Sequence, residues 1–375
     1  MRNPFVHKYE VANRIDISRS AVLHNFDLMS SVTGKDIIPV LKSNAYGHGL
    51  KEVATILKDR SFPYIAVDGY FEALAIRKIS KQPVLIMGSL GANDINVLAK
   101  KLFAFVLYSL ESLQQVERAR KPVIIHLEIN TGMNRHGIEL EELPEVIARI
   151  KAQPNITLEG VMTHFATADE VDISFMKQQQ SKFEKAVQLV RTAGYNPKHI
   201  HTSNSAASSK PQSQSITAIR PGIALYGLNT LDVTDEYYTA FKNLHPVMQL
   251  TSRVDQIRTI SKNETVGYNR TYKASGVQKV ATIPIGYYEG IPRSLGNQSF
   301  ITYKKRLLQT TGKICMNHTM FDCTNTNLKV GDEVILISAD PNDPNCILNL
   351  RRSFGLFEYS LPTNFSNAIR RRVVA

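Results

Sequence analysis

The chain has 375 residues, of which 43% are hydrophobic and 21% charged, and its formal net charge is +12. This length suits one large barrel with a smaller domain, or two to three average domains, and the composition is that of an ordinary globular protein. No apolar run approaches the roughly 20 residues that cross a bilayer. Residues 1–16 also lack the apolar core of a signal peptide.

The cysteines and the charge pattern exclude several classes of protein. Cys315, Cys323 and Cys346 are too few and too dispersed for a disulfide framework or a metal site, so we expect a cytoplasmic protein without a metal. The basic residues form isolated triplets at 304–306 and 370–372, without a basic stripe or interleaved aromatic residues. We therefore expect no nucleic-acid partner, although a positive field favours anionic ligands such as a phosphorylated cofactor.

The first two thirds of the chain alternate between strand-like and helix-like patterns. Residues 1–10 are a polar lead-in, residues 14–17 alternate like a short strand, and Ser18 suits the N-cap of a helix that reaches Met29. Helical patterns such as 143–151 and 175–193 then separate eight apolar runs, at 37–41, 64–67, 84–87, 103–107, 123–129, 158–162, 199–202 and 222–226. This alternation predicts a parallel sheet closed as a (β/α)8 barrel, although an open doubly wound sheet would give the same pattern.

The pattern changes after about residue 240. Short alternating runs occur at 248–257, 280–284, 299–303 and 333–337, separated by glycine, asparagine and proline, and one helical pattern covers 346–354. This pattern of short strands and turns predicts an all-β second domain. We place the barrel domain at residues 12–240 and the β-domain at 241–375, with residues 1–11 packed on the β-domain.

One decapeptide organises the first domain: Val40-Leu41-Lys42-Ser43-Asn44-Ala45-Tyr46-Gly47-His48-Gly49. It begins as a buried strand and breaks into polar residues and two glycines that can adopt positive φ before a helix. Lys42 thus ends a strand, where barrels place their chemistry, and partial desolvation would lower the pKa of its amine for Schiff-base formation. Alone, such a lysine is as well explained as a solvated strand end.

Four more polar segments follow predicted strands, at 128–135, 163–166, 201–205 and 220–223. Each alone is explained as well by a surface arginine, a hydrogen-bonded core histidine or a serine-rich turn. Five such clusters at one end of successive strands together predict an active site. Ser205 offers a hydroxyl and Gly222 allows close backbone approach, which suits a phosphate at the last two strands.

These motifs closely resemble those of alanine racemases, the fold-type III enzymes that use pyridoxal 5′-phosphate (PLP). The resemblance runs from about Arg14 to the C-terminus. It implies these cofactor contacts: Lys42 as the covalent anchor, Tyr46, Ser205, Gly222 and Ile223 at the phosphate, His164 stacked on the ring, Arg220 at the pyridine nitrogen, and Asn204 as a further contact. Because arginine keeps its proton at ordinary pH, Arg220 would leave the ring nitrogen unprotonated and the ring a weaker electron sink, which suits a racemase.

Residues 265–272 and 285–290 resemble the C-terminal motifs of the same family. They imply that Tyr268 faces Lys42 from the partner subunit of a homodimer, so that two bases of unperturbed pKa about 10 serve opposite faces of a planar carbon. By resemblance Lys42 acts on the D-enantiomer and Tyr268 on the L-enantiomer. The implied substrate contacts are Arg135, Met316, which binds the carboxylate through its backbone and also crosses the interface, and Tyr287 at the entrance.

Three departures from the family pattern bear on specificity. Glu128 stands where many relatives carry a carbamylated lysine, and as a carboxylate it could pair with Arg135. Asn317 replaces a usual aspartate beside the substrate carboxylate. Asn367 aligns with a usual tyrosine near the substrate methyl, which predicts a wider pocket that also admits serine.

The sequence therefore predicts a homodimeric PLP enzyme that interconverts L- and D-alanine for peptidoglycan supply, with no membrane partner. The nearest alternative is a serine or broad-specificity racemase on the same scaffold. A PLP decarboxylase fits the implied roles of Tyr268 and Arg220 less well. A non-catalytic PLP-binding protein built on the barrel would need no second base such as Tyr268.

Overall fold

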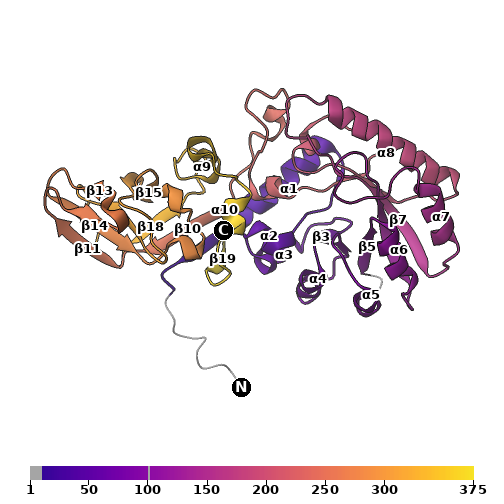
Figure 1. Ribbon diagram of the computed structural model, residues 1–375, viewed down its shortest axis with the longest axis horizontal. Helices are drawn as coiled ribbons and strands as arrows, with labels where there is room; N and C mark the ends of the chain where they lie inside the picture. The colour runs from indigo at the N-terminus through magenta and orange to yellow at the C-terminus, as the bar shows by residue number, and fades with distance from the viewer. Residues whose placement is uncertain (1–10, 100–101) are drawn as a thin grey trace, which may run out of the picture. The chain divides into compact units, whose positions relative to one another are not determined.

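The computed structural model describes residues 11–99 and 102–375, which form two compact units (Figure 1). The barrel unit comprises residues 20–46 and 53–245, and the β unit comprises the described residues up to 19 together with 47–52 and 246–375. The expected packing of residues 1–11 falls almost entirely outside the described residues.

The barrel unit is built on eight parallel strands in the order β2-β9-β8-β7-β6-β5-β4-β3. They are β2 (Asp36–Ile37), β3 (Ile65–Val67), β4 (Val84–Ile86), β5 (Phe103–Leu107), β6 (Val123–Glu128), β7 (Ile156–Met162), β8 (His199–His201) and β9 (Ala218–Ile219). The edge strands meet through a parallel bridge between Val40 and Ala66, where Leu41 N donates to Ala66 O at 2.8 Å and Ala66 N to Pro39 O at 2.9 Å. This closure confirms the predicted TIM-like barrel and excludes an open doubly wound sheet.

Helices connect and cover the barrel strands, as Figure 1 shows for α4 to α8. The helices are α1 (Arg19–Thr33), α2 (Lys42–Tyr46), α3 (Leu50–Leu57), α4 (Tyr70–Arg77), α5 (Ala92–Leu98), α6 (Leu110–Glu117), α7 (Leu143–Lys151) and α8 (Ser174–Thr192), with 3₁₀ turns η1 (Ala207–Ser209), η2 (Ile223–Tyr226) and η3 (Tyr238–Phe241). The helical patterns predicted at 143–151 and 175–193 correspond to α7 and α8. Their apolar positions, such as Phe183 on α8, are buried.

The prediction of a strand at 222–226 is wrong. The eighth strand is the two-residue β9, and Ile223–Tyr226 forms the 3₁₀ turn η2. The whole run is buried, and a short buried apolar run has the same sequence pattern whether it is a strand or a helical turn. Tyr226 fixes the turn, because its hydroxyl donates to Val40 O at 3.0 Å.

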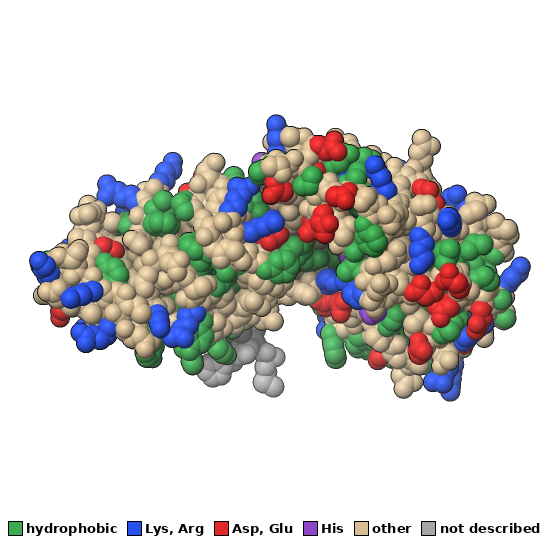
Figure 2. Space-filling view, turned by 45° about the horizontal axis from the view of Figure 1, so that its top comes forward, with side chains coloured by type: hydrophobic (Ala, Val, Ile, Leu, Met, Phe, Trp, Pro, Cys, Tyr) green, Lys and Arg blue, Asp and Glu red, His purple; other side chains and the backbone are tan. Residues whose placement is uncertain are grey.

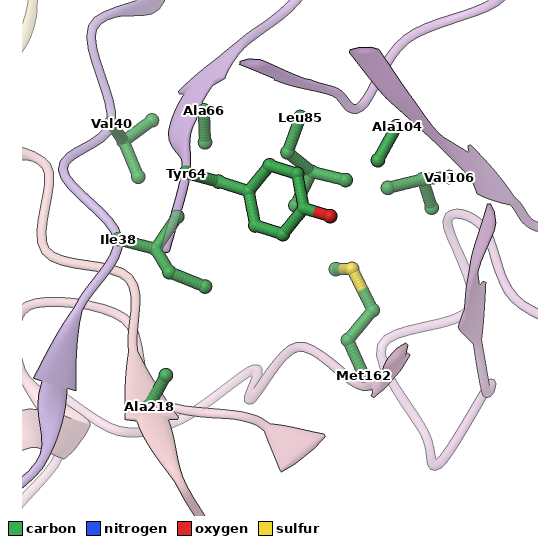
Figure 3. Close-up of a cluster of buried hydrophobic side chains, with 9 residues drawn as sticks. All are labelled: Ile38, Val40, Tyr64, Ala66, Leu85, Ala104, Val106, Met162 and Ala218. Atoms are coloured by element: carbon green, nitrogen blue, oxygen red, sulfur yellow. The ribbon is translucent and has the colours of Figure 1, made fainter. Parts of the chain in front are cut away.

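Large and small side chains alternate inside the barrel. Figure 3 shows Tyr64, Leu85 and Met162 projecting into the interior, between the smaller side chains of the neighbouring strands. The cluster consists of Ile38, Val40, Tyr64, Ala66, Leu85, Ala104, Val106, Met162 and Ala218. Because alanines face the larger residues, the interior is filled by side chains and leaves the chemistry to the strand ends.

The β unit contains three sheets, which confirms the predicted strand-rich second domain. A six-stranded sheet has the order β16-β15-β18-β10-β1-β19, a three-stranded sheet β11-β14-β17, and β12 pairs with β13. The strands are β1 (Arg14–Ser18), β10 (Met248–Arg253), β11 (Gln256–Ile260), β12 (Thr265–Val266), β13 (Tyr272–Lys273), β14 (Gln278–Ile283), β15 (Phe300–Tyr303), β16 (Arg306–Gln309), β17 (Thr319–Asp322), β18 (Glu333–Ile337) and β19 (Arg370–Val374). Its helices are α9 (Ile347–Phe354) and α10 (Ser360–Thr363), and its 3₁₀ turns are η4 (Tyr268–Arg270), η5 (Tyr287–Glu289) and η6 (Arg293–Leu295).

Strands from both ends of the chain lie together in the six-stranded sheet. β1 pairs antiparallel with β10 and parallel with β19. Asp16 on β1 accepts hydrogen bonds from Arg14 Nε at 2.9 Å and from Arg372 Nε at 2.9 Å. This carboxylate neutralises part of the arginine triplet at 370–372, which gives that triplet a structural partner within the sheet.

Surface charge is mixed over the face shown in Figure 2. Basic and acidic side chains are interspersed on the barrel unit, and basic side chains predominate over acidic ones on the β unit. No helix among the described residues is long and apolar enough to cross a bilayer.

Candidate active site at the barrel mouth

Lys42 begins a turn of unusual handedness. Ser43, Asn44, Ala45 and Tyr46 have φ between 52° and 54°, so the chain makes a left-handed turn directly after the strand. Such a conformation costs roughly 1–2 kcal/mol per non-glycine residue. The surroundings compensate for this cost, because Ala45 is fully buried and Asn44 N donates to Glu72 Oε1 at 3.2 Å.

Tyr46, at the end of this turn, lies against the backbone of Gly222. A Cβ on Gly222 would lie 2.3 Å from the Tyr46 hydroxyl, so only glycine allows this approach. Burial raises the pKa of Tyr46 to about 12, against a smaller opposing effect of Arg135, and the hydroxyl therefore stays protonated. Two glycines follow the turn with positive φ, Gly47 at 82° and Gly49 at 102°, as their sequence context predicts.

Ser205 gathers backbone N–H groups beside Gly222. Its Oγ accepts from Gly222 N at 3.0 Å and from Ala224 N at 3.1 Å, where η2 begins with the buried Ile223. Backbone N–H groups converging on one oxygen are the geometry that binds an anion. Asn204 shapes the same loop, since its Oδ1 accepts from the N–H of Ala207 at 3.0 Å.

A fully buried ion pair fixes the end of the Ser205 loop. Lys210 Nζ lies 2.9 Å from Asp235 Oδ2, and both side chains are at most 1% exposed. The same ammonium donates to the backbone carbonyl of Glu170. The pair therefore joins the segments that contain Glu170, Lys210 and Asp235.

Arg220 is anchored under the barrel mouth by its two terminal nitrogens. Nη1 donates to His201 O at 2.7 Å and to His201 Nδ1 at 2.9 Å, and Nη2 donates to Thr163 O at 2.7 Å and Thr202 O at 3.0 Å. Within the described residues, Nε donates to none of these acceptors. Burial lowers the pKa of Arg220 to about 10, partly offset by Glu128, so the guanidinium keeps its charge at neutral pH.

His164 is neutral beside this cation. Its Nδ1 lies 3.4 Å from Arg220 Nη2, and burial, followed by the charges of Arg220, Arg135 and Lys42, lowers its pKa to about 3. Gln179 on α8 holds the adjoining backbone, because its Nε2 donates to His164 O at 3.1 Å. Gln179 is not among the predicted site residues, although the sequence carries a signal for it: a polar residue on the apolar stripe between Met176 and Phe183.

Glu128 and Arg135 lie near the same charges without a direct ion pair. Glu128 is 6% exposed, and burial raises its pKa against the opposing effects of Arg220, His136, Arg135 and Lys42. In the described part of the chain, no ion pair within 4.0 Å joins Glu128 to Arg135, so their direct pairing stays a prediction. The carboxylate nevertheless offsets part of the positive charge around Arg220.

The remaining predicted residues lie in the β unit and are exposed. Tyr268 is 64% exposed, Met316 54% and Tyr287 43%. Tyr287 N donates to Cys315 O at 3.0 Å, which places Tyr287 beside the segment that contains Met316. Tyr268 follows Gly267, whose φ of 72° allows the tight turn that presents the phenol. The structure thus forms two groups of predicted site residues, one in each unit.

Comparison with known proteins gives the family. The model for the N-terminal domain of alanine racemase matches residues 17–230, and that for the C-terminal domain matches residues 247–373. The chain belongs to the alanine racemase family. It is 33% identical over 341 residues to an alanine racemase of Geobacter sp. (strain M21), covering 87% of this chain and 89% of that one, and 33% identical over 371 residues to one of Leptospira interrogans, covering 96% and 95%.

Solved alanine racemases share the fold over nearly the whole chain. The enzyme of Clostridium difficile 630 superposes with a TM-score of 0.89 at 28% identity, covering 98% of this chain and 97% of that one. The enzyme of Bacillus anthracis with bound L-Ala-P gives a TM-score of 0.88 at 27% identity, covering 98% and 96%. No group of three or more His, Cys, Asp or Glu residues within the described ranges is placed to hold a metal ion.

Proposed function

We propose that the protein is a PLP-dependent alanine racemase that interconverts L- and D-alanine. Membership of the alanine racemase family supports the reaction class. The observation that carries the proposal is the anchoring of Arg220: a buried, charged guanidinium holds its Nη groups on protein acceptors and keeps Nε apart from them. A cofactor ring nitrogen is the acceptor that this donor suits, since arginine can donate but never accept.

The barrel residues fit PLP at both of its ends. Ser205, the N–H groups of Gly222 and Ala224, and the Tyr46 hydroxyl would hold the phosphate. Lys42, at the start of the left-handed turn that ends at Tyr46, would provide the covalent anchor. When bound, PLP makes the α-hydrogen of an amino acid acidic by delocalising the charge left at Cα.

Two bases would then move the proton at Cα from opposite faces. We assign Lys42 to the D-enantiomer and Tyr268 of the partner subunit to the L-enantiomer. The exposure of Tyr268 on a tight turn supports a role at an interface between two copies of the chain. Arg135 and Met316 of the partner subunit would bind the substrate, Tyr287 would lie at the substrate entrance, and His164 would stack on the cofactor ring.

Mixing two inactive variants tests the shared site. Lys42→Ala and Tyr268→Phe should each lose racemisation of L-alanine, measured with added PLP by chiral separation of the product. After denaturation and refolding as a mixture, half of the dimers are hybrids, and each hybrid contains one intact Lys42–Tyr268 pair. Activity should recover to about a quarter of the unmodified enzyme, because half of the dimers carry one of two sites. No recovery would place both bases in one chain.

Serine is the substrate that distinguishes the second candidate function. Asn367 is exposed in the β unit, and an amide in place of an aromatic ring would widen the pocket and offer a hydrogen-bond partner to the serine hydroxyl. L-serine and L-alanine should therefore be offered in parallel. Comparable turnover would favour a broad-specificity racemase, and Asn367→Tyr should then lower serine turnover relative to alanine by roughly tenfold. Turnover confined to alanine would remove this candidate.

We place the activity in the cytoplasm, where D-alanine would supply peptidoglycan precursors. The two-domain division at residues 12–240 and 241–375 belongs to the same proposal. The family models support it, since they meet between residues 230 and 247.

A further inference from the structure

Two buried histidines form a chain with Arg220 that the proposed reaction does not use. His201 Nδ1 lies 2.9 Å from Arg220 Nη1, and His201 Nε2 lies 2.7 Å from His126 Nδ1. Both histidine side chains are fully buried. These two hydrogen bonds therefore lead from the candidate cofactor site into the barrel interior without contact with solvent.

Gly160 makes the second contact possible. His126 is on β6 and His201 on β8, and β7 lies between these strands with Gly160 opposite His126. A Cβ on Gly160 would lie 2.4 Å from His126 Nδ1 and 2.6 Å from its Cγ. Only glycine lets the His126 ring cross β7 and reach His201.

The direction of every hydrogen bond in this chain follows from Arg220. A guanidinium has donors only, so while the contact between Arg220 Nη1 and His201 Nδ1 is made, His201 Nδ1 accepts and carries no proton. His201 then carries its proton on Nε2 and donates it to His126 Nδ1, which leaves the His126 proton on its own Nε2. Burial, together with the charge of Arg220, lowers the pKa of both imidazoles, in agreement with two neutral rings.

We propose that His126 is a positioning residue: by accepting from His201 it selects the His201 tautomer that can accept from Arg220, and so orients the guanidinium toward the cofactor ring. The inference rests on the proposed function only for the identity of that ring. Arg220 also donates to three backbone carbonyls, which place it in the barrel. His201 adds the one acceptor whose state can change, and His126 fixes that state.

The surroundings of His126 Nε2 distinguish a positioning role of His126 from simple packing. His126 Nε2 is buried and has no hydrogen-bond partner within the described residues. Its neighbours are the Tyr64 ring, edge-on at 5.0 Å, and the His199 ring at 5.9 Å. Because buried N–H groups without acceptors are rare, an apolar ring would pack here with less loss. A histidine at this site is therefore explained better by its Nδ1 acceptor than by its packing.

Histidine tautomers report directly on the inference. Protein labelled with ¹⁵N-histidine should show His201 and His126 as Nε2–H tautomers, unchanged between pH 5.5 and 9, in both the PLP-free and the PLP-loaded protein. His126→Phe keeps a ring but removes the acceptor, so the His201 signals should then show a mixture of tautomers. His199→Phe is the matched control, because His199 is also buried beside Tyr64 but takes no part in the hydrogen bonds between His126, His201 and Arg220. It should leave the His201 signals unchanged.

The PLP-loaded enzyme gives a second measurement, of the cofactor's absorption and of the steady-state kinetics. His126→Phe and, independently, Gly160→Ala should shift the absorption band of bound PLP and lower kcat for L-alanine about tenfold, while KM changes less than twofold; His199→Phe should change neither. An Nδ1–H tautomer of His201 in the unmodified protein, or a His126→Phe variant with unaltered His201 signals and PLP spectrum, overturns the inference. Because the tautomers are measured without substrate, the inference can fail while racemisation persists, and the tautomers can agree with it even if alanine is not the substrate.

Discussion

Unfolding at mildly acidic pH should take up protons at the buried histidines of the barrel. In the folded chain, burial, followed by the neighbouring His199 and Arg220, lowers the pKa of His126 to about 3. Burial and Arg220 keep the pKa of His201 well below its ordinary value. In an unfolded chain both imidazoles return to a pKa of about 6.5.

The magnitude follows from these shifts. At pH 5 an unfolded histidine is about 97% protonated, whereas folded His126 is about 1% protonated, so the His126 ring takes up about one proton on unfolding. The folded pKa lies below the unfolded one, so this stabilisation is fully present above about pH 6.5 and is lost as the pH falls. At pH 5 the loss is about 2 kcal/mol for His126, and His201 adds a loss of the same sign.

Proton uptake can be measured directly. The PLP-free protein is unfolded with guanidinium chloride in unbuffered solution held at pH 5, and the acid needed to restore the pH is titrated. Other groups contribute to the total, but the difference between the unmodified chain and His126→Phe isolates one imidazole. The variant should take up about one proton fewer at pH 5 and the same number at pH 8. A difference below half a proton at pH 5 would refute the argument that His126 is held neutral.

Three substitutions test other parts of the site. Gly222→Ala brings a Cβ to 2.3 Å from the Tyr46 hydroxyl and should weaken PLP binding 10- to 100-fold in a reconstitution titration, about the worth of one charge-assisted hydrogen bond. Gly69→Ala is the control, because its Cβ would enter open space, and it should leave PLP affinity unchanged. Equal affinities of the two variants would contradict a phosphate site at Gly222. Glu128→Ala removes the carboxylate predicted to hold Arg135 and should raise the KM for L-alanine about tenfold in steady-state assays. Unchanged kinetics would show that Glu128 does not position Arg135. Lys210→Met leaves a buried carboxylate unpaired and should destabilise the protein by about 3–5 kcal/mol in denaturant unfolding; a loss below about 1 kcal/mol would show that the carboxylate finds another partner.

Strand pattern and motif position could be read from the sequence because both are local. The apolar runs alternate with helical periodicity, and Lys42 directly follows such a run. The left-handed turn after Lys42 could not be predicted in the same way. Ser43, Asn44, Ala45 and Tyr46 have no shared preference for positive φ, and the conformation is imposed by contacts such as that of Asn44 with Glu72, distant in sequence.

The supporting residues of the site were missed for a similar reason. His126 reaches His201 only because Gly160, on the strand between them, has no side chain. Gln179 contacts the His164 backbone only once α8 packs on the barrel. Each of these relations depends on three-dimensional register, so the sequence shows the residues but not their partners.

The segment that leads from β2 to Lys42 adds few hydrogen bonds to the barrel wall. β2 contains two residues, and beyond Pro39 the wall is held by the Val40–Ala66 bridge and its few hydrogen bonds. Local opening begins where backbone hydrogen bonds are fewest, so the amides of Leu41 and Ala66 should exchange with solvent before those of the central strands β5 and β6. A cofactor held at Lys42 would add contacts beside this bridge, so its removal should speed amide exchange at Leu41 and Ala66.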